Sequence, residues 1–86
     1  MSKYAVEVKL AARKELDGLP DTVLARVVRH IESLGDLPRP AGCKTLKEYR
    51  DQWRIRIGDW RVVYLIDETL KRVSIVRIAH RRDVYE

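Results

Sequence analysis

The spacing of apolar and polar residues in the first part of the chain predicts a strand and then a short helix. Residues 4–8 alternate bulky apolar side chains with alanine and glutamate, which is typical of a half-buried strand. Residues 9–16 are expected to form a helix, with Leu10 and Leu16 as its inward-facing residues. A Gly-Leu-Pro sequence at residues 18–20 should end this helix.

A second helix is predicted to follow at once, starting at Pro20 or Asp21. Proline suits a first helical turn, and aspartate suits an N-cap. Gly35 is expected to close this helix, and His30 is interpreted as an exposed helix residue. The two helices should form a hairpin. Apolar residues recur along the second helix at helical spacing and form one stripe: Val23, Leu24, Val27, Val28, Ile31 and Leu34.

The second half of the chain changes to a period of two, which predicts strands. A loop at residues 36–44 and a brief strand or turn at 46–49 are expected first. Strands should follow at residues 52–57, 60–66 and 72–79. The predicted fold class is α+β, in the order β-α-α-β-β-β, with an N-terminal helical hairpin packed on a mainly antiparallel sheet.

The turn between the first two of these strands fixes which residues face each other. Gly58-Asp59 is a two-residue hairpin signal of the Gly-X kind, suited to a type II′ turn. Counting back from it places Arg56 directly opposite Arg61, with Arg54 on the same face. Like charges in that position destabilise a sheet. The arrangement favours a bound anion between the arginines; the alternative is that both extend into water.

The two faces of this hairpin differ in polarity. The arginine face is expected to carry Val63 and Leu65, with Val73 and Ile75 of the next strand. An exposed apolar patch beside a basic one is typical of a partner site. An amphipathic helix or a strand with acidic groups would cover it. The opposite face should receive the helices, through Trp53, Ile55, Ile57, Trp60, Val62, Tyr64 and Ile66.

Composition and charge narrow the possible partners. The 86 residues suffice for one domain, residues 1–86, and the single cysteine excludes an internal disulfide. No apolar run is long enough to cross a membrane, and no signal peptide is visible, so a cytoplasmic protein without a membrane partner is expected. Residues 39–86 carry twelve Lys/Arg against seven Asp/Glu, which accounts for the whole net charge of +5. Nine of the twelve are arginines, whose planar donor fork suits phosphate, so a polyanion is the favoured partner.

The C-terminal sequence adds candidate chemistry. His80 can act as an acid or a base near neutral pH, and Tyr85 can stack on a base or pass a proton. The alternative is that both are structural residues at the edge of the sheet. Two distant histidines and one cysteine do not have the spacing of metal ligands, and no phosphate-cradling glycine loop is present. Neither a metal nor another cofactor is expected.

Two motifs, found together, resemble the RelE/ParE superfamily of toxin–antitoxin toxins. They are Trp53-Arg-Ile-Arg-Ile-Gly-Asp-Trp-Arg-Val-Val-Tyr64 and the ending His80-Arg-Arg-Asp-Val-Tyr85. The order of elements fits the superfamily over essentially the whole chain. The resemblance implies a RelE-like fold, similar to that of microbial ribonucleases. It also implies a toxin that enters the ribosomal A site and cuts mRNA without metal, by attack of the 2′-hydroxyl on the adjacent phosphate. A cognate RelB-like antitoxin would neutralise it, and the pair would bind operator DNA only as a complex.

The resemblance also implies roles for individual residues. Arg54 and Arg56 match two lysines on the catalytic strand of RelE, and Arg61 matches its phosphate-binding arginine. Arg81 lies near the position of the leaving-group arginine, and Tyr85 matches the C-terminal tyrosine. The basic residues around them are expected to bind RNA: Lys44, Lys47, Arg50, Arg77 and Arg82.

The proposed general base of RelE is the lysine that Arg54 replaces. Arginine stays protonated in proteins and is therefore a poor base. Three interpretations follow: His80 or Tyr85 takes the proton, catalysis relies on electrostatic stabilisation of the phosphorane, or the enzyme is weak.

Two other functions fit the same fold. A ParE-type toxin would inhibit DNA gyrase by protein contact, without nuclease activity. A nucleic-acid-binding module would bind RNA with a steep salt dependence and leave no cut ends. The dense basic face and Tyr85 favour the RelE-type nuclease.

Overall fold

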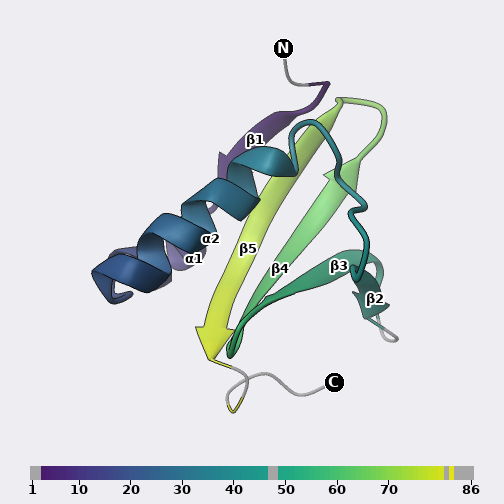
Figure 1. The fold of residues 1–86 in the computed structure, drawn as a ribbon. Helices are drawn as coiled ribbons and strands as arrows, with labels where there is room; N and C mark the ends of the chain where they lie inside the picture. The colour runs from purple at the N-terminus through teal and green to yellow at the C-terminus, as the bar shows by residue number, and fades with distance from the viewer. Residues whose placement is uncertain (1–2, 47–48, 81, 83–86) are drawn as a thin grey trace.

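The computed structural model describes residues 3–46, 49–80 and 82, with the backbone alone described at 46 and 49–51. Strands and helices follow the predicted order, and the α+β class is confirmed. The structure has one strand more than the predicted order. This strand, β2, lies near the position where a brief strand or turn was expected, at 46–49. The elements in Figure 1 are β1 (Ala5–Val8), α1 (Leu10–Asp17), α2 (Asp21–Ser33), β2 (Lys44–Leu46), β3 (Tyr49–Ile57), β4 (Trp60–Asp67) and β5 (Arg72–His80).

The strands form one sheet in the order β1-β5-β4-β3-β2. β1 pairs with β5 in parallel, and the other three pairings are antiparallel, as the sequence predicts. β3 begins at Tyr49, three residues before the expected start, because β2 supplies a pairing partner for that stretch. Where a strand begins and ends depends on such cross-strand hydrogen bonds. The alternation of apolar and polar side chains gives no information about them.

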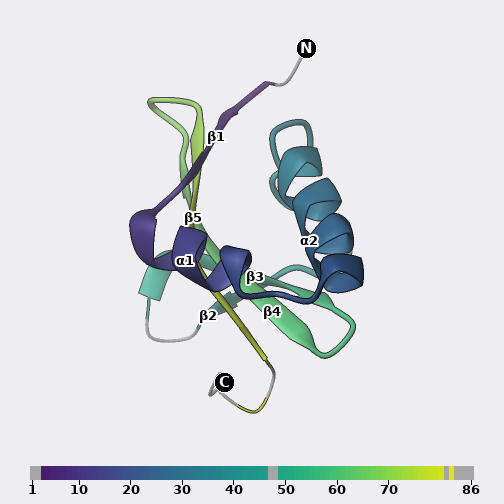
Figure 2. The same cartoon turned by 90° about the vertical axis from the view of Figure 1, so that its left-hand side faces the viewer.

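Helix α2 covers one face of the sheet, whereas α1 lies beside β5 (Figures 1 and 2). The apolar stripe of α2 supplies Val27, Ile31 and Leu34 to the core. The expectation for Leu10 is wrong, since 72% of this residue is exposed and Ala12 is the buried residue of α1. A helix beside a sheet edge buries a narrower strip than one lying on a face, and a small residue is enough to fill it.

Glu15 of α1 contacts the edge of β5 beyond the point where β1 ends. β1 pairs with residues 72–75 of β5, and within the described part of the chain the rest of that edge has no strand neighbour. The carboxylate of Glu15 on α1 accepts a hydrogen bond from the backbone N–H of Ile78, with a length of 2.9 Å. This side chain therefore occupies the place of a sheet partner at an otherwise open edge.

A β-bulge decides which face the residues of β5 occupy. Val63 pairs with Arg77, but the next residue, Tyr64, pairs with Ile75, so β5 has one extra residue at this point. In a regular ladder, Ile75 would lie opposite Leu65 on the arginine face. The bulge moves it to the core instead. The prediction that Val73 and Ile75 lie on the arginine face is therefore wrong.

The exposed apolar patch expected beside the arginines is also absent from the described residues. Val73 and Ile75 are fully buried in the core. Val63 does lie on the arginine face, but only 6% of it is exposed. The described part of this face therefore offers charge, with only Leu65 as a half-buried apolar residue.

The loop at residues 36–43, which leads from α2 towards β2, is fastened to the sheet at two points. The buried hydroxyl of Tyr64 donates to the carbonyl oxygen of Pro38, at 2.7 Å. Burial raises the pKa of Tyr64 well above its usual range, so the hydroxyl stays a donor. Arg39 pairs with Glu68 at 2.8 Å and lies over the Trp53 ring, 5.0 Å from its centroid.

Glu68 provides a pH-dependent part of this fastening. The hydrogen bond from the Tyr4 hydroxyl, followed by that from Arg39, lowers the pKa of Glu68 from about 4.5 to about 2. Because the pKa is lower in the folded protein, the stabilisation is complete above about pH 4.5 and disappears as the pH falls through 2. We therefore expect Glu68→Gln to be less stable than the wild type at pH 7, with a difference that shrinks to nothing near pH 2.

Urea unfolding from pH 2 to 7 measures this difference. Glu32→Gln, on an exposed part of α2, is the matched control and should track the wild type throughout. A destabilisation by Glu68→Gln that does not change with pH would contradict the assignment.

Candidate functional site

The hairpin register places two arginines side by side, as predicted. Ile57 pairs with Trp60 across the two-residue turn, and Arg56 pairs with Arg61. Gly58 has a φ of +61°, the left-handed region that the first position of a type II′ turn requires. The Arg56 side chain is held near the turn by a 3.2 Å hydrogen bond from its Nε to the Gly58 carbonyl. The like-charge pair therefore lies close to a two-residue turn, which fixes its register.

A second row of basic residues crosses the same face. Lys44 on β2 pairs with Arg54 on β3, Arg54 pairs with Val63 on β4, and Val63 pairs with Arg77 on β5. Directly paired residues share a face, so cations from four strands line one side of the sheet.

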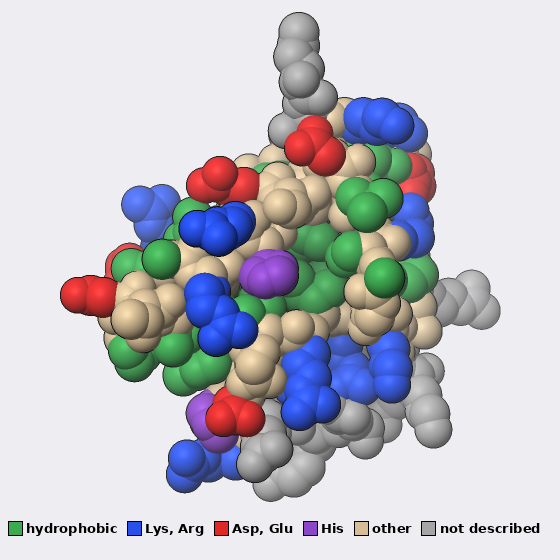
Figure 3. All heavy atoms as spheres, viewed as in Figure 1, with side chains coloured by type: hydrophobic (Ala, Val, Ile, Leu, Met, Phe, Trp, Pro, Cys, Tyr) green, Lys and Arg blue, Asp and Glu red, His purple; other side chains and the backbone are tan. Residues whose placement is uncertain are grey.

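A small pocket lies where these rows meet. Its volume is about 130 Å³, roughly that of four water molecules in the liquid. Arg54 and Arg61 are half-buried there, and Nη1 of Arg61 is shielded from solvent. Figure 3 shows basic side chains gathered at this end of the molecule. The lining, here called the arginine pocket, consists of Gly42, Lys44, Arg54, Arg56 and Arg61.

The described lining of the arginine pocket has the chemistry of an anion site. Every charged lining residue that the structure describes is cationic. Guanidinium forks bind phosphate oxygens through paired N–H donors, and partial burial strengthens that attraction relative to open water. The predicted residues Lys44, Arg54, Arg56 and Arg61 are thus brought together.

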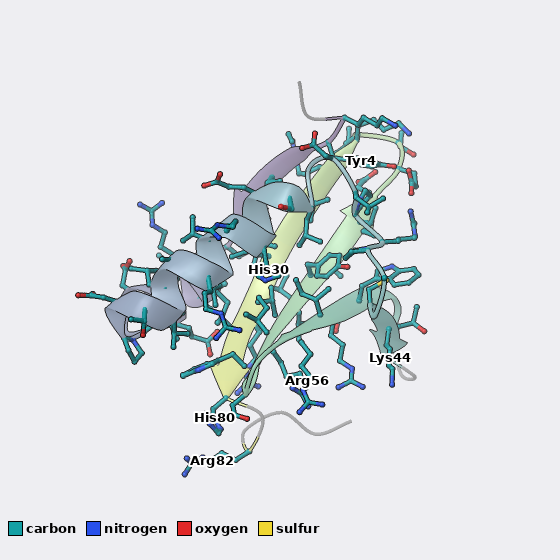
Figure 4. All side chains as sticks on the ribbon, viewed as in Figure 1. Tyr4, His30, Lys44, Arg56, His80 and Arg82 are labelled. Atoms are coloured by element: carbon teal, nitrogen blue, oxygen red, sulfur yellow. The ribbon has the colours of Figure 1, made fainter. Side chains whose placement is uncertain are left out.

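The structure places other predicted residues elsewhere. His80 pairs with Trp60 and meets its ring edge-on at a centroid distance of 5.3 Å, on the opposite face from Arg61. Its Nδ1 accepts a 3.2 Å hydrogen bond from Nε of Arg82. Arg77 lies 3.7 Å from Glu15. Figure 4 shows His80 and Arg82 at the end of β5, apart from Lys44 and Arg56.

Some predicted site residues fall outside the described part of the chain. Lys47, Arg81 and Tyr85 are among them, and of Arg50 only the backbone is described. Their roles in RNA binding and catalysis stay predictions.

Sequence reasoning did not find Gly42 and Arg26 as neighbours of the site. Gly42 lines the arginine pocket with a φ of +88°, which a residue with a side chain adopts only with strain. A guanidinium nitrogen of Arg26 on α2 lies 3.6 Å from where a Cβ on Gly58 would stand. The sequence carried no signal for Arg26, because its approach to the turn depends on how α2 packs on the sheet.

Comparison with known proteins shows which family the chain belongs to. Residues 6–85 match the family model described as the ParE toxin of the parDE type II toxin–antitoxin system. The chain belongs to the RelE/ParE superfamily of type II toxin–antitoxin toxins. Among curated relatives, toxin RelG of Mycobacterium tuberculosis is 35% identical over 95% of both chains. Toxin RelE of the same organism is 32% identical, over 95% of this chain and 86% of its own length.

Solved structures of the superfamily have the same fold. The toxin–antitoxin complex RelBE2 of M. tuberculosis contains a chain with a TM-score of 0.82 and 33% identity, covering 92% of this chain and 99% of its own. The archaeal RelE–RelB complex of Pyrococcus horikoshii gives a TM-score of 0.83 and 25% identity, over 95% and 99% of the two chains. The RelE-like fold predicted from the sequence is confirmed.

The described residues contain no helix of the length and apolarity needed to cross a membrane. They also contain no group of three or more His, Cys, Asp or Glu side chains placed to hold a metal ion.

The arginine pocket predicts stabilisation by phosphate. With phosphate at about ten times its dissociation constant, the free energy of unfolding should rise by about 1.4 kcal/mol. This corresponds to a Tm increase of about 6–10 °C for a domain of this size. Thermal melts in phosphate and in sodium chloride of equal ionic strength measure it.

The gain should be lost in Arg61→Ala and kept in Arg29→Ala, an exposed arginine on α2. Equal gains in all three proteins would mean that phosphate acts through the solvent and that the pocket binds no anion.

Proposed function

We propose that this toxin is a RelE-type endoribonuclease that cuts mRNA on the ribosome. The observation that supports the proposal is the cross-strand pair Arg56–Arg61 in a pocket whose described charged residues are all cationic. Like charges that face each other across two strands disfavour a sheet, and a phosphate bound between the two guanidinium groups would favour this arrangement. The proposal also draws on the RelE-named relatives and on the RelE residues that these arginines match.

The proposed reaction is a transfer within the RNA. The 2′-oxygen attacks the adjacent phosphorus, and the bond from phosphorus to the 5′-oxygen breaks. The products are a 2′,3′-cyclic phosphate and a 5′-hydroxyl. Arg56 and Arg61 would hold the two non-bridging oxygens, whose negative charge grows in the transition state. Arg54 would position the 2′-hydroxyl region, while Arg81 would stabilise or protonate the leaving oxygen and Tyr85 would stack on or orient the nucleotide.

Of the three interpretations of the missing base, we propose electrostatic stabilisation. The face that carries Arg56 and Arg61 presents charges that are present before the substrate arrives, so they need no reorganisation during the reaction. His80 is less suited to the role of base, because it lies on the Trp60 side of the sheet with its Nδ1 engaged by Arg82. In this proposal the 2′-hydroxyl proton passes to water.

The proposed partners follow from the same comparison. The two solved structures named above are a toxin–antitoxin complex and a RelE–RelB complex, and we propose a RelB-like antitoxin that neutralises this toxin. The ribosome and mRNA would be its targets in the cytoplasm, and operator DNA would be bound only through the toxin–antitoxin complex. Lys44 in the arginine pocket is proposed to bind an RNA phosphate, and Arg77 and Arg82, which lie outside the pocket, are proposed to bind phosphates farther along the RNA.

Arg61→Ala should reduce cleavage of a translated message by about 100-fold or more, as expected when one preorganised donor to the developing charge is removed. Induction in cells, followed by primer extension on that message, measures the cut ends. Arg29→Ala is the matched control and should cut like the wild type. Cleavage by Arg61→Ala at the wild-type level would contradict the assignment of this residue.

The same induction separates the competing functions. Cuts within codons support the nuclease. Growth arrest with DNA-damage signalling and intact message would instead indicate a ParE-type gyrase inhibitor, and RNA binding without cut ends would indicate a binding module.

His80→Ala should retain cleavage within about threefold of the wild type, because the ring is directed away from the arginine pocket. Primer extension on the same message measures it. A loss as large as that of Arg61→Ala would assign the proton transfer to His80 and contradict the electrostatic proposal.

A further inference from the structure

A second hollow opens beside the arginine pocket, between α2 and the loop at residues 36–43. Its volume is about 340 Å³, at the lower end of the range for small-molecule sites. Figure 3 shows it as a depression floored by hydrophobic side chains, with basic side chains below it, and Figure 4 shows His30 on its α2 side. The lining, here called the α2–loop groove, consists of His30, Pro40, Ala41, Gly42, Ile55 and Arg56.

The groove and the arginine pocket share part of their lining. Gly42 and Arg56 line both of them. A molecule with its anionic group among the arginines would reach the groove past these two residues. Arg26 adds another cation from α2 close to the hairpin turn at Gly58. The surroundings of the groove thus match an anionic ligand in charge.

The groove itself has a different chemistry from the arginine pocket. Pro40, Ala41 and Ile55 give it apolar surfaces, and the exposed ring of His30 adds one aromatic wall. An imidazole offers donor and acceptor nitrogens at its edge. A nucleobase has the matching properties, with two apolar faces that stack on rings and an edge that forms hydrogen bonds.

We propose that the α2–loop groove holds a nucleobase of the RNA strand whose phosphate occupies the arginine pocket, and that His30 reads that base. The inference rests on the proposed function, since it names a subsite of the same RNA-binding surface. His30 is thus a specificity-determining residue, and not merely an exposed residue of α2. The α2–loop groove selects among bases, while the arginine pocket binds any phosphate.

The test is a titration of the toxin with nucleoside 5′-monophosphates and with ribose 5-phosphate, which has the same phosphate and sugar but no base. NMR signals of the His30 ring report on the groove, and arginine Nε–H signals report on the arginine pocket. At least one nucleotide should shift the His30 signals and bind about five-fold or more tightly than ribose 5-phosphate, as expected for one stacked base.

Three variants and one control variant locate the effect. Ala41→Phe fills the groove, and His30→Ala removes its aromatic wall; both should bring nucleotide affinity down to that of ribose 5-phosphate. Arg61→Ala should weaken nucleotides and ribose 5-phosphate alike. Arg29→Ala, elsewhere on α2, should change neither. Ala41 and His30 are exposed, so these substitutions are expected to leave the fold intact, and a thermal melt checks it.

The outcomes separate this inference from the proposed function. Equal affinity for nucleotides and ribose 5-phosphate, or His30 signals that stay still while the arginine signals saturate, would overturn the groove assignment and leave the nuclease proposal standing. His30 signals that move only when an antitoxin is added would likewise overturn it, in favour of a protein occupant. Base-dependent binding by a toxin that cuts no message would support the groove and count against the nuclease.

Discussion

The two-residue turn at Gly58-Asp59 is the constraint on which the site depends. A turn this short leaves no freedom in the register, so Arg56 must face Arg61. Glycine at position 58 allows the positive φ that the turn requires. Two like charges are thereby held on adjacent strands, and in our proposal they are in place before an anion binds. Preorganised charge of this kind is the most effective way to stabilise negative charge that grows during a reaction.

The rest of the site depends on how the loop at residues 36–43 is fixed. Tyr64 and Glu68 belong to β4 and the turn after it, yet they fasten Pro38 and Arg39. This loop brings Gly42 to the wall shared by the arginine pocket and the α2–loop groove. Contacts made by Tyr64 and Glu68 therefore fix the loop that carries Gly42 to the arginine pocket. Core residues such as Tyr64 contribute to the site without touching it.

The superfamily contains toxins of different action on one fold, so the decisive features are side chains and not topology. The family model is named for ParE, while the relatives named here are called RelE and RelG. In our proposal, Arg54 and Arg56 stand where RelE has two catalytic-strand lysines. An arginine in place of a lysine loses an amine that can give up its proton, and each of the two arginines adds a planar guanidinium group that binds phosphate. It favours a mechanism that relies on charge, and it makes the identity of the bound base depend on surfaces outside the arginine pocket.

The sequence by itself determined the features that local geometry controls. The helical stripe of α2, the alternation in β3 and β4, and the turn at Gly58 each depend on neighbours a few residues apart, and so the Arg56–Arg61 pair was predictable. Only the tertiary structure decided the bulge that moves Ile75 into the core, the position of His80 on the Trp60 face, and the approach of His30 to Gly42. These depend on how elements distant in sequence meet, and packing between them is not encoded in the period of any one segment.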